Sequence, residues 1–178
     1  MTKRSRSGVA AQPPIGTAAS EASFEAFFES EHRTLFRRMC LITGNPAEAE
    51  ELIQDAFMKL WERWDRVATM EDRTGYLYRT AMNLFRKRYR HALVAARRTF
   101  RAEPQADVIA LVEARSAVSQ ALASLSPRQR AALVLTDLIG FSSEEAATML
   151  GVRPGTIRSL ASQGRSAIRG SHTEEGSR

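Results

Sequence analysis

The chain has almost none of the residues that form covalent or metal cross-links. Cys40 is its one cysteine, which excludes a disulfide within the chain and a cysteine-cluster zinc site. It falls on an apolar stripe with Phe28, Leu35, Phe36 and Met39, so we expect a buried thiol. The three histidines are scattered, and the last lies near the C-terminus. We therefore expect neither a metal nor a cofactor.

Long apolar runs and common catalytic motifs are also missing. No stretch is long enough to cross a bilayer, and the basic N-terminus lacks the apolar run of a signal peptide. There is no glycine-rich phosphate loop, no HExxH and no nucleophile elbow. These absences predict a cytoplasmic protein that is not an enzyme and does not insert into a membrane.

Charge is present in quantity and is unevenly placed. The 26 Lys and Arg outnumber the 20 Asp and Glu, for a net charge of +6. Residues 86–101 and 151–170 carry basic side chains and no acid, whereas the charged side chains of residues 43–72 are mostly acidic. Basic stretches suit a phosphate backbone, and the acidic stretch suits a protein partner. We therefore expect two kinds of partner.

Helical periodicity covers nearly the whole chain, and no stretch has a convincing strand pattern. This predicts an all-α protein with two small helical domains joined by a flexible linker. The expected helices cover 23–42, 46 to about 64, 74–91, 108–125, 127–138, 143–150 and 154–169. The expected divisions are a disordered tail (1–22), a first domain (23–95), a linker (96–110), a second domain (111–170) and a C-terminal tail (171–178).

The second domain has the pattern of a helix-turn-helix. Ser126-Pro127 and Ser142 with Glu145 are helix starts, and Gly151 suits a helix end. The helix from Pro154 carries no acid and can enter a major groove. Gly164 costs ~1 kcal/mol relative to Ala, so we expect this helix to be loose or to end early. Its candidate DNA-contacting residues are Arg153, Thr156, Arg158, Ser159, Ser162, Gln163 and Arg165.

Two helices of the first domain have distinctive outer faces. In the helix over 74–91, Arg79, Asn83, Arg86 and Arg90 share one face, and Lys87 lies beside them. Arginine suits phosphates and asparagine can read a base edge, but a solvated basic face is the alternative. The acidic helix from Pro46 turns a core stripe inward, including Trp61. Its outer face can dock a protein or be an ordinary charged exterior; it carries Gln54, Asp55, Met58, Lys59 and Glu62.

Together these motifs resemble those of a known family. Residues 46–61 (PAEAEELIQDAFMKLW) resemble region 2.2 of the extracytoplasmic-function (ECF) sigma factors of bacterial RNA polymerase. Residues 76–84 (YLYRTAMNL) and the basic run after them resemble regions 2.3 and 2.4. Residues 125–130 (LSPRQR) and 155–159 (GTIRS) resemble region 4. The resemblance covers about residues 24–169.

The resemblance implies an alternative sigma factor that recognises a promoter, melts it and initiates transcription of a specific regulon. The helix from Pro46 would dock on the β′ clamp helices of core RNA polymerase, and the β flap would be a second contact. The loop over 67–72 and the helix after it would capture the −10 element with a flipped base. The recognition helix would read the −35 element, and control would come from a separate anti-sigma factor.

Two other classes of protein remain open. A stand-alone helix-turn-helix regulator would share the second domain without needing the acidic helix or the second basic helix. A scaffold protein with a sigma-like fold would bind polymerase without opening promoters.

Overall fold

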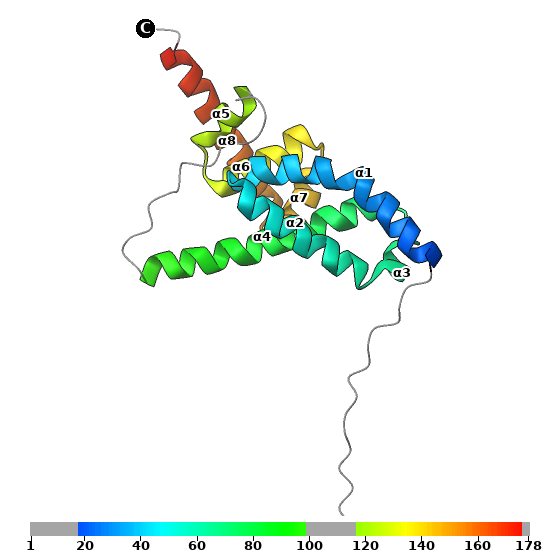
Figure 1. The fold of residues 1–178 in the computed structure, drawn as a ribbon. Helices are drawn as coiled ribbons and strands as arrows, with labels where there is room; N and C mark the ends of the chain where they lie inside the picture. The colour runs from blue at the N-terminus through cyan, green and yellow to red at the C-terminus, as the bar shows by residue number, and fades with distance from the viewer. Residues whose placement is uncertain (1–17, 99–116, 176–178) are drawn as a thin grey trace, which may run out of the picture.

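The computed structural model describes residues 18–98 and 117–175, and all the regular elements in these ranges are helices. This confirms the all-α prediction. The chain order is visible in Figure 1. The first domain contains α1 (Ala18–Thr43), α2 (Pro46–Trp61), α3 (Trp64–Val67) and α4 (Arg73–Arg98). The second contains α5 (Ala117–Ala123), α6 (Pro127–Leu133), η2 (Val134–Leu138), α7 (Ser143–Leu150) and α8 (Pro154–Glu175).

The first domain is built on α1, α2 and α4, with α2 packed against both of the others. Their buried faces follow the expected apolar stripes, with Leu35 of α1, Ile53 of α2 and Leu77 of α4 fully enclosed. Burial of such side chains stabilises the fold by about 1.5–3 kcal/mol each. Cys40 is also buried here, as its position on the stripe predicted.

The helix starts of the second domain are those that the sequence predicted. Ser126 and Gln129 form one capping box at α6, and Ser142 and Glu145 form another at α7. Gly151 ends α7 with φ of +63°, a left-handed conformation that favours glycine. Between α6 and α7 the chain widens into the short π-helix η2, where the Ile139 N–H donates to the Val134 carbonyl at 3.0 Å. The expected helix over 127–138 is therefore continuous but not α-helical throughout.

Several helix boundaries differ from the predictions. α1 begins at Ala18, inside the segment expected to be a disordered tail, and α4 continues to Arg98. The predicted loop before α4 contains α3, because Trp64 and Val67 turn into the core and hold one more helical turn there. Residues 1–17, most of the predicted linker and the first half of the helix expected over 108–125 lie outside the described residues.

The prediction that Gly164 would loosen α8 or end it early is wrong. α8 runs through Gly164 to Glu175, and Gly164 is buried. A Cβ at this position would lie 2.7 Å from Leu133 Cδ1 and 3.4 Å from Leu125 Cδ1. The glycine lets α8 approach α6 closely, and the packing that results offsets the lost helix propensity.

The two domains lie against each other. α6 packs on α1 and α7 packs on α4, and in Figure 1 the second domain sits alongside the first with α6 beside the end of α1. The buried residues of both domains belong to one continuous hydrophobic cluster. None of the described helices has the length and hydropathy needed to cross a membrane.

Candidate nucleic-acid interface

The outer face of α4 presents most of the basic residues that the sequence assigned to it. Arg79, Asn83, Lys87 and Arg90 are exposed, which agrees with their expected position. Arg86 differs, because it is partly buried and its Nε–H has no hydrogen-bond partner among the described residues. Its guanidinium lies over Gly151 of the second domain, where an added Cβ would collide with it. The structure thus brings four of the five residues together and turns the fifth toward α7.

Between α2 and α4 the surface forms a hollow of about 450 Å³. Tyr76 lies in its lining, and its hydroxyl accepts a 3.4 Å hydrogen bond from Arg63 Nη1. Lys59 and Glu62, which the sequence grouped with a protein-docking face, line this hollow instead of the surface beside Met58. Arg63 was missed by the sequence analysis. The full lining is Lys59, Glu62, Arg63, Tyr76, Arg79, Thr80, Asn83, Leu84 and Lys87.

The loop before α4 is tied to the helix that follows it. Asp72 Oδ1 accepts a 2.7 Å hydrogen bond from the Gly75 N–H, and Asp72 Oδ2 lies 3.6 Å from Arg79 Nη2. A carboxylate at a helix N-terminus satisfies a donor that has no partner within the helix. Asp72 therefore fixes the end of the 67–72 loop and the direction of one arginine.

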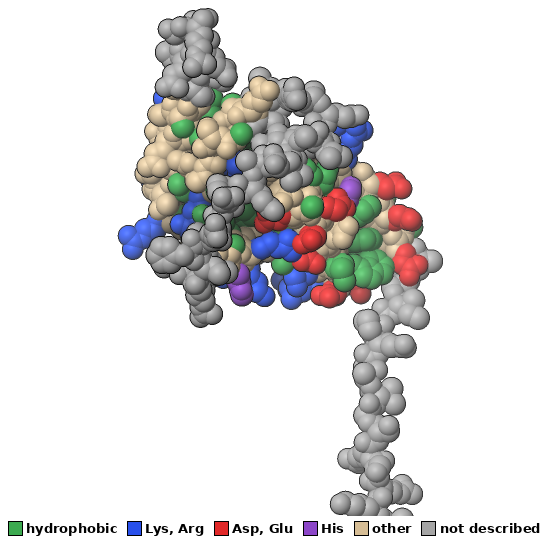
Figure 2. Space-filling model, turned by 60° about the vertical axis from the view of Figure 1, so that its left-hand side comes forward, with side chains coloured by type: hydrophobic (Ala, Val, Ile, Leu, Met, Phe, Trp, Pro, Cys, Tyr) green, Lys and Arg blue, Asp and Glu red, His purple; other side chains and the backbone are tan. Residues whose placement is uncertain are grey.

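A second hollow, of about 740 Å³, is apolar and lies between α1 and α2. Met58, Trp61 and Phe28 are 64, 41 and 36 % exposed, although the sequence placed Trp61 and Phe28 on core stripes. The Trp61 and Phe28 side chains are partly exposed to solvent because none of the described residues covers this end of the α1–α2 pair. Figure 2 shows hydrophobic side chains gathered among acidic ones on this face. The lining residues are Glu21, Phe24, Glu25, Phe28, Gln54, Phe57, Met58 and Trp61.

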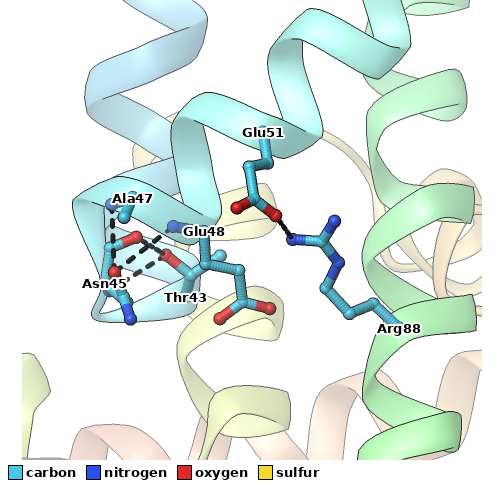
Figure 3. Close-up of polar contacts among 6 residues, drawn as sticks. All are labelled: Thr43, Asn45, Ala47, Glu48, Glu51 and Arg88. Carbon is cyan, nitrogen blue, oxygen red and sulfur yellow. Dashed lines mark hydrogen bonds and ion pairs between the residues drawn. The ribbon is translucent and has the colours of Figure 1, made fainter.

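The start of α2 is held rigidly, which fixes the direction of its outer face (Figure 3). Asn45 caps the helix by accepting from the Ala47 N–H at 3.0 Å and the Glu48 N–H at 3.2 Å, and Pro46 stands at the first position. Farther along, Arg88 Nη1 of α4 donates to Glu51 Oε2 at 2.8 Å. With α2 fixed at these points, Asp55 and Met58 project into solvent.

All seven residues predicted for the recognition helix are exposed, six of them on α8 and Arg153 just before it, while Ile157 and Ala161 face the core. Two of the seven form ion pairs within their own domain. Arg158 Nη1 lies 3.4 Å from Glu144 Oε1, and Arg165 Nη1 lies 2.9 Å from Asp137 Oδ2. These four side chains are between 43 and 68 % exposed, so solvent screening makes each pair weak. The arginines therefore remain available to phosphates.

Comparison with known proteins identifies this arrangement. Family models match the Sigma-70 region 2 over residues 27–93 and the Sigma-70 region 4 over residues 115–168. The ECF RNA polymerase sigma factor SigM of Mycobacterium tuberculosis is 32% identical over 159 residues, covering 85% of this chain and 78% of that protein. SigE of Mycolicibacterium smegmatis is 30% identical over 173 residues, covering 91% and 66%.

Solved structures agree with the sequence relatives. The sigma factor RpoE in complex with the anti-sigma factor NepR, from Bartonella quintana, has a TM-score of 0.61 and 25% identity, and covers 82% of this chain and 94% of that one. CnrH in complex with the cytosolic domain of CnrY shares the fold, with a TM-score of 0.55 and 21% identity over 89% and 91% of the two chains.

The chain therefore belongs to the sigma-70 family of RNA polymerase sigma factors, and within that family to the ECF group. It is an alternative sigma factor, a DNA-binding regulator of transcription initiation. The match to region 2 gives no support to a stand-alone helix-turn-helix regulator, which would share only the second domain.

Proposed function

We propose that this sigma factor divides promoter recognition and polymerase binding among three surfaces. The outer face of α2 docks on the β′ clamp helices of core RNA polymerase. The hollow between α2 and α4 captures the −10 element as a single strand, and α8 reads the −35 element as a duplex. The protein has no catalytic step of its own and acts in the cytoplasm, where it meets polymerase.

The observation that carries the docking assignment is the exposure of Met58 and Asp55 on the rigid helix α2. Methionine is flexible and polarizable, so an exposed one suits a surface that repacks against a helical partner. The residues assigned to this contact are Gln54, Asp55, Met58, Lys59 and Glu62, with Lys59 and Glu62 at the border of the −10 hollow. The half-exposed rings of Trp61 and Phe28 extend the same surface.

The −10 assignment is supported by the chemistry of the hollow between α2 and α4. A flipped base must regain the stacking and hydrogen bonds that it loses when the duplex opens. Tyr76 supplies a ring on which a base can stack, and Asn83 supplies an amide that can pair with a base edge. Arg79, Lys87 and Arg90 lie on the same exposed face and suit the phosphates, and Arg86 joins them if the second domain moves away.

The −35 assignment is supported by the exposed face of α8. A recognition helix reads bases with residues near its N-terminus and holds phosphates with the residues around them. Thr156, Ser159 and Gln163 are suited to base edges, while Arg153 and Arg158 are suited to phosphates. The proposed set is completed by Ser162 and Arg165. The β flap is the proposed polymerase contact of this domain, and an anti-sigma factor is the proposed source of control.

The test is binding of the purified full-length protein to sigma-free core RNA polymerase. Asp55→Arg should raise the Kd by about tenfold or more. The substitution puts a positive charge where the partner surface is expected to complement a negative one. Asp65→Arg, at an exposed position of α3, makes the same change of charge elsewhere and should leave the Kd within about twofold of wild type. Failure of the wild-type protein to bind core polymerase would overturn the docking assignment, as would equal binding by both variants.

A further inference from the structure

The apolar hollow between α1 and α2 has aromatic walls. Each helix contributes four lining side chains at helical spacing, so each turns one stripe toward the hollow. The Phe24 and Trp61 ring centres lie 5.0 Å apart, and those of Phe28 and Phe57 lie 4.7 Å apart. The rings of the two helices therefore form one continuous surface. Phe57 is buried beneath it, whereas Phe28 and Trp61 keep part of their surface in solvent, so the hollow can bury apolar groups of an occupant.

The rim of this hollow is acidic. Glu21 and Glu25 of α1 line it and are exposed, and Asp55 is exposed on the neighbouring helix α2. The described residues that line the hollow include no lysine or arginine. Figure 2 shows acidic side chains around the hydrophobic ones on this face. An occupant that complements the hollow thus carries apolar groups beside positive charge.

The segment that immediately precedes α1 has this composition. Residues 9–15 (VAAQPPI), which lie outside the described residues, are apolar apart from Gln12. Residues 3–6 (KRSR) carry three positive charges and no acid. Adjacent prolines favour the extended polyproline II conformation. Peptides of this kind dock in aromatic-lined grooves because they are extended before they bind and lose little entropy.

The connection to α1 is short enough to keep this segment at the hollow. The hollow lies along the first part of α1, where the helix from Ala18 to Phe28 is about 15 Å long at 1.5 Å per residue. Five residues of polyproline II cover the same length at about 3.1 Å each. Gly16 stands just before α1, and glycine permits the sharp reversal that returns a chain along the helix. Residues 9–15 can therefore reach the aromatic rings, and residues 3–6 can reach the acidic rim.

We propose that the apolar hollow between α1 and α2 holds the chain's own N-terminal segment, with residues 9–15 against the aromatic rings and residues 3–6 at the acidic rim. A segment joined directly to its site acts at an effective concentration of about 1 mM. A contact with a Kd of ~0.1 mM, which is weak for a separate peptide, is then occupied in about nine of ten molecules.

Occupation of the hollow has a consequence for polymerase binding. Met58 and Trp61 line the hollow and also belong to the surface that we propose to dock on core RNA polymerase. The N-terminal segment and core polymerase then compete for this surface. This consequence, unlike the occupation itself, rests on the proposed docking role of α2.

The experiment measures how well the full-length protein shields Trp61 from acrylamide, a neutral quencher of tryptophan fluorescence. The chain has two tryptophans, and Trp64 is only 2 % exposed, so quenching reports mainly on Trp61. A Trp61→Phe variant gives the background from Trp64. Circular dichroism checks that every variant is folded.

Three variants change the segment without shortening it. The first, Pro13→Ser/Pro14→Ser/Ile15→Ser, removes apolar groups proposed to meet the rings. Its matched control changes only polar residues of the same segment, Gln12→Ser/Thr17→Ser. The third, Lys3→Ser/Arg4→Ser/Arg6→Ser, removes the charges proposed to meet the acidic rim.

We expect the apolar variant to raise the quenching constant of Trp61 about twofold or more over wild type, because the segment leaves the hollow. The polar control should match wild type. The charge variant should raise quenching by a smaller amount, and wild type should approach it at about 1 M salt, where screening acts within roughly 3 Å. The apolar variant should also bind core polymerase up to about tenfold more tightly, since the competing state is lost.

The possible negative results are distinguishable, because quenching needs no polymerase. Equal quenching of the apolar variant and the polar control would overturn the proposal, whatever the polymerase affinity. Shielding that increases with protein concentration would also overturn it, since the occupant would then be a second copy of the chain. If shielding is lost but the Kd for polymerase is unchanged, the segment does occupy the hollow. In that case the extension of the polymerase contact to Trp61 and Phe28 fails instead.

Discussion

Replacing Gly164 with alanine separates the local preference of α8 from its packing. Helix propensity alone predicts that Gly164→Ala stabilises the protein by about 0.5–1 kcal/mol, because alanine loses less conformational freedom on folding. The structure predicts the opposite sign. A Cβ at residue 164 would lie 2.7 Å from Leu133 Cδ1, closer than side-chain carbons approach, and 3.2 Å from Leu133 Cγ, which is a tight contact. Leu133 is itself buried and has little room to move.

The magnitude follows from these two opposing effects. Inserting a methyl group into a well-packed core costs typically about 1–3 kcal/mol. Subtracting the gain in propensity leaves a net loss of roughly 0–2.5 kcal/mol for Gly164→Ala. Gly170→Ala is the matched control on the same helix, because an added Cβ at Gly170 meets nothing within 4 Å. The Gly170→Ala substitution should raise the free energy of unfolding by about 0.5–1 kcal/mol.

Urea denaturation followed by circular dichroism measures both variants against wild type. The expected difference between them is the packing cost, about 1–3 kcal/mol. A third variant, Leu133→Val, shortens the side chain that the new Cβ meets. In the double variant Leu133→Val/Gly164→Ala the two changes should couple favourably, because one makes room for the other.

Equal stabilisation by Gly164→Ala and Gly170→Ala would refute the reasoning, since it would mean that α8 does not approach α6 as closely as described. Additive behaviour of the Leu133 and Gly164 substitutions would refute it independently. If the reasoning holds, Gly164→Ala should also weaken −35 binding, because relief of the collision tilts the helix that carries Gln163 and Arg165.

Two other predictions concern ionisable groups. The pKa of Glu145 is lowered from its usual 4.5 by hydrogen bonds from the Ser142 N–H and hydroxyl, so its stabilising effect is full above that value and is lost as the pH falls through the lowered pKa. Ser142→Ala should cost about 1 kcal/mol at neutral pH and less in acid, as urea titrations at the two pH values would reveal; an equal cost at both would contradict the assignment. Burial, aided by Glu50, raises the pKa of Cys40 to about 11, so the native thiol should resist Ellman's reagent near neutral pH and react once urea unfolds the chain. Rapid labelling of the native protein would show that α1 is open.

The helix starts were the most predictable part of the fold, because their causes are local. Asn45-Pro46, Ser126-Pro127 and Ser142 with Glu145 each satisfy backbone N–H groups within three residues, so sequence spacing alone carries the information. The helix ends were less predictable. α4 and α8 run past their expected ends, and neither of these expected ends, both within the described residues, has a glycine in left-handed conformation.

The sequence predicted which side of each helix carries the candidate site residues. It did not predict the surfaces that the helices form when they pack together. Periodicity assigned Arg86 to the basic face of α4, yet it cannot show that the second domain packs there. Periodicity likewise assigned Trp61 and Phe28 to apolar stripes, which is correct. These stripes extend beyond the helices that cover them, so both side chains at this end are partly exposed. The hollow that joins Lys59 with Asn83 depends on how α2 crosses α4, a long-range property that neither helix encodes alone.

The ion pairs on the helices that we propose to face DNA bear on how such a protein avoids indiscriminate binding. Arg79 pairs with Asp72, Arg158 with Glu144 and Arg165 with Asp137, each within its own domain. Exposed pairs of this kind are worth about 0–1 kcal/mol, so a well-placed phosphate can replace the carboxylate at little cost. The carboxylate still opposes the approach of a poorly placed phosphate, because it remains beside the arginine. Non-specific affinity, which depends on summed charge, is thereby reduced more than specific affinity, which depends on geometry.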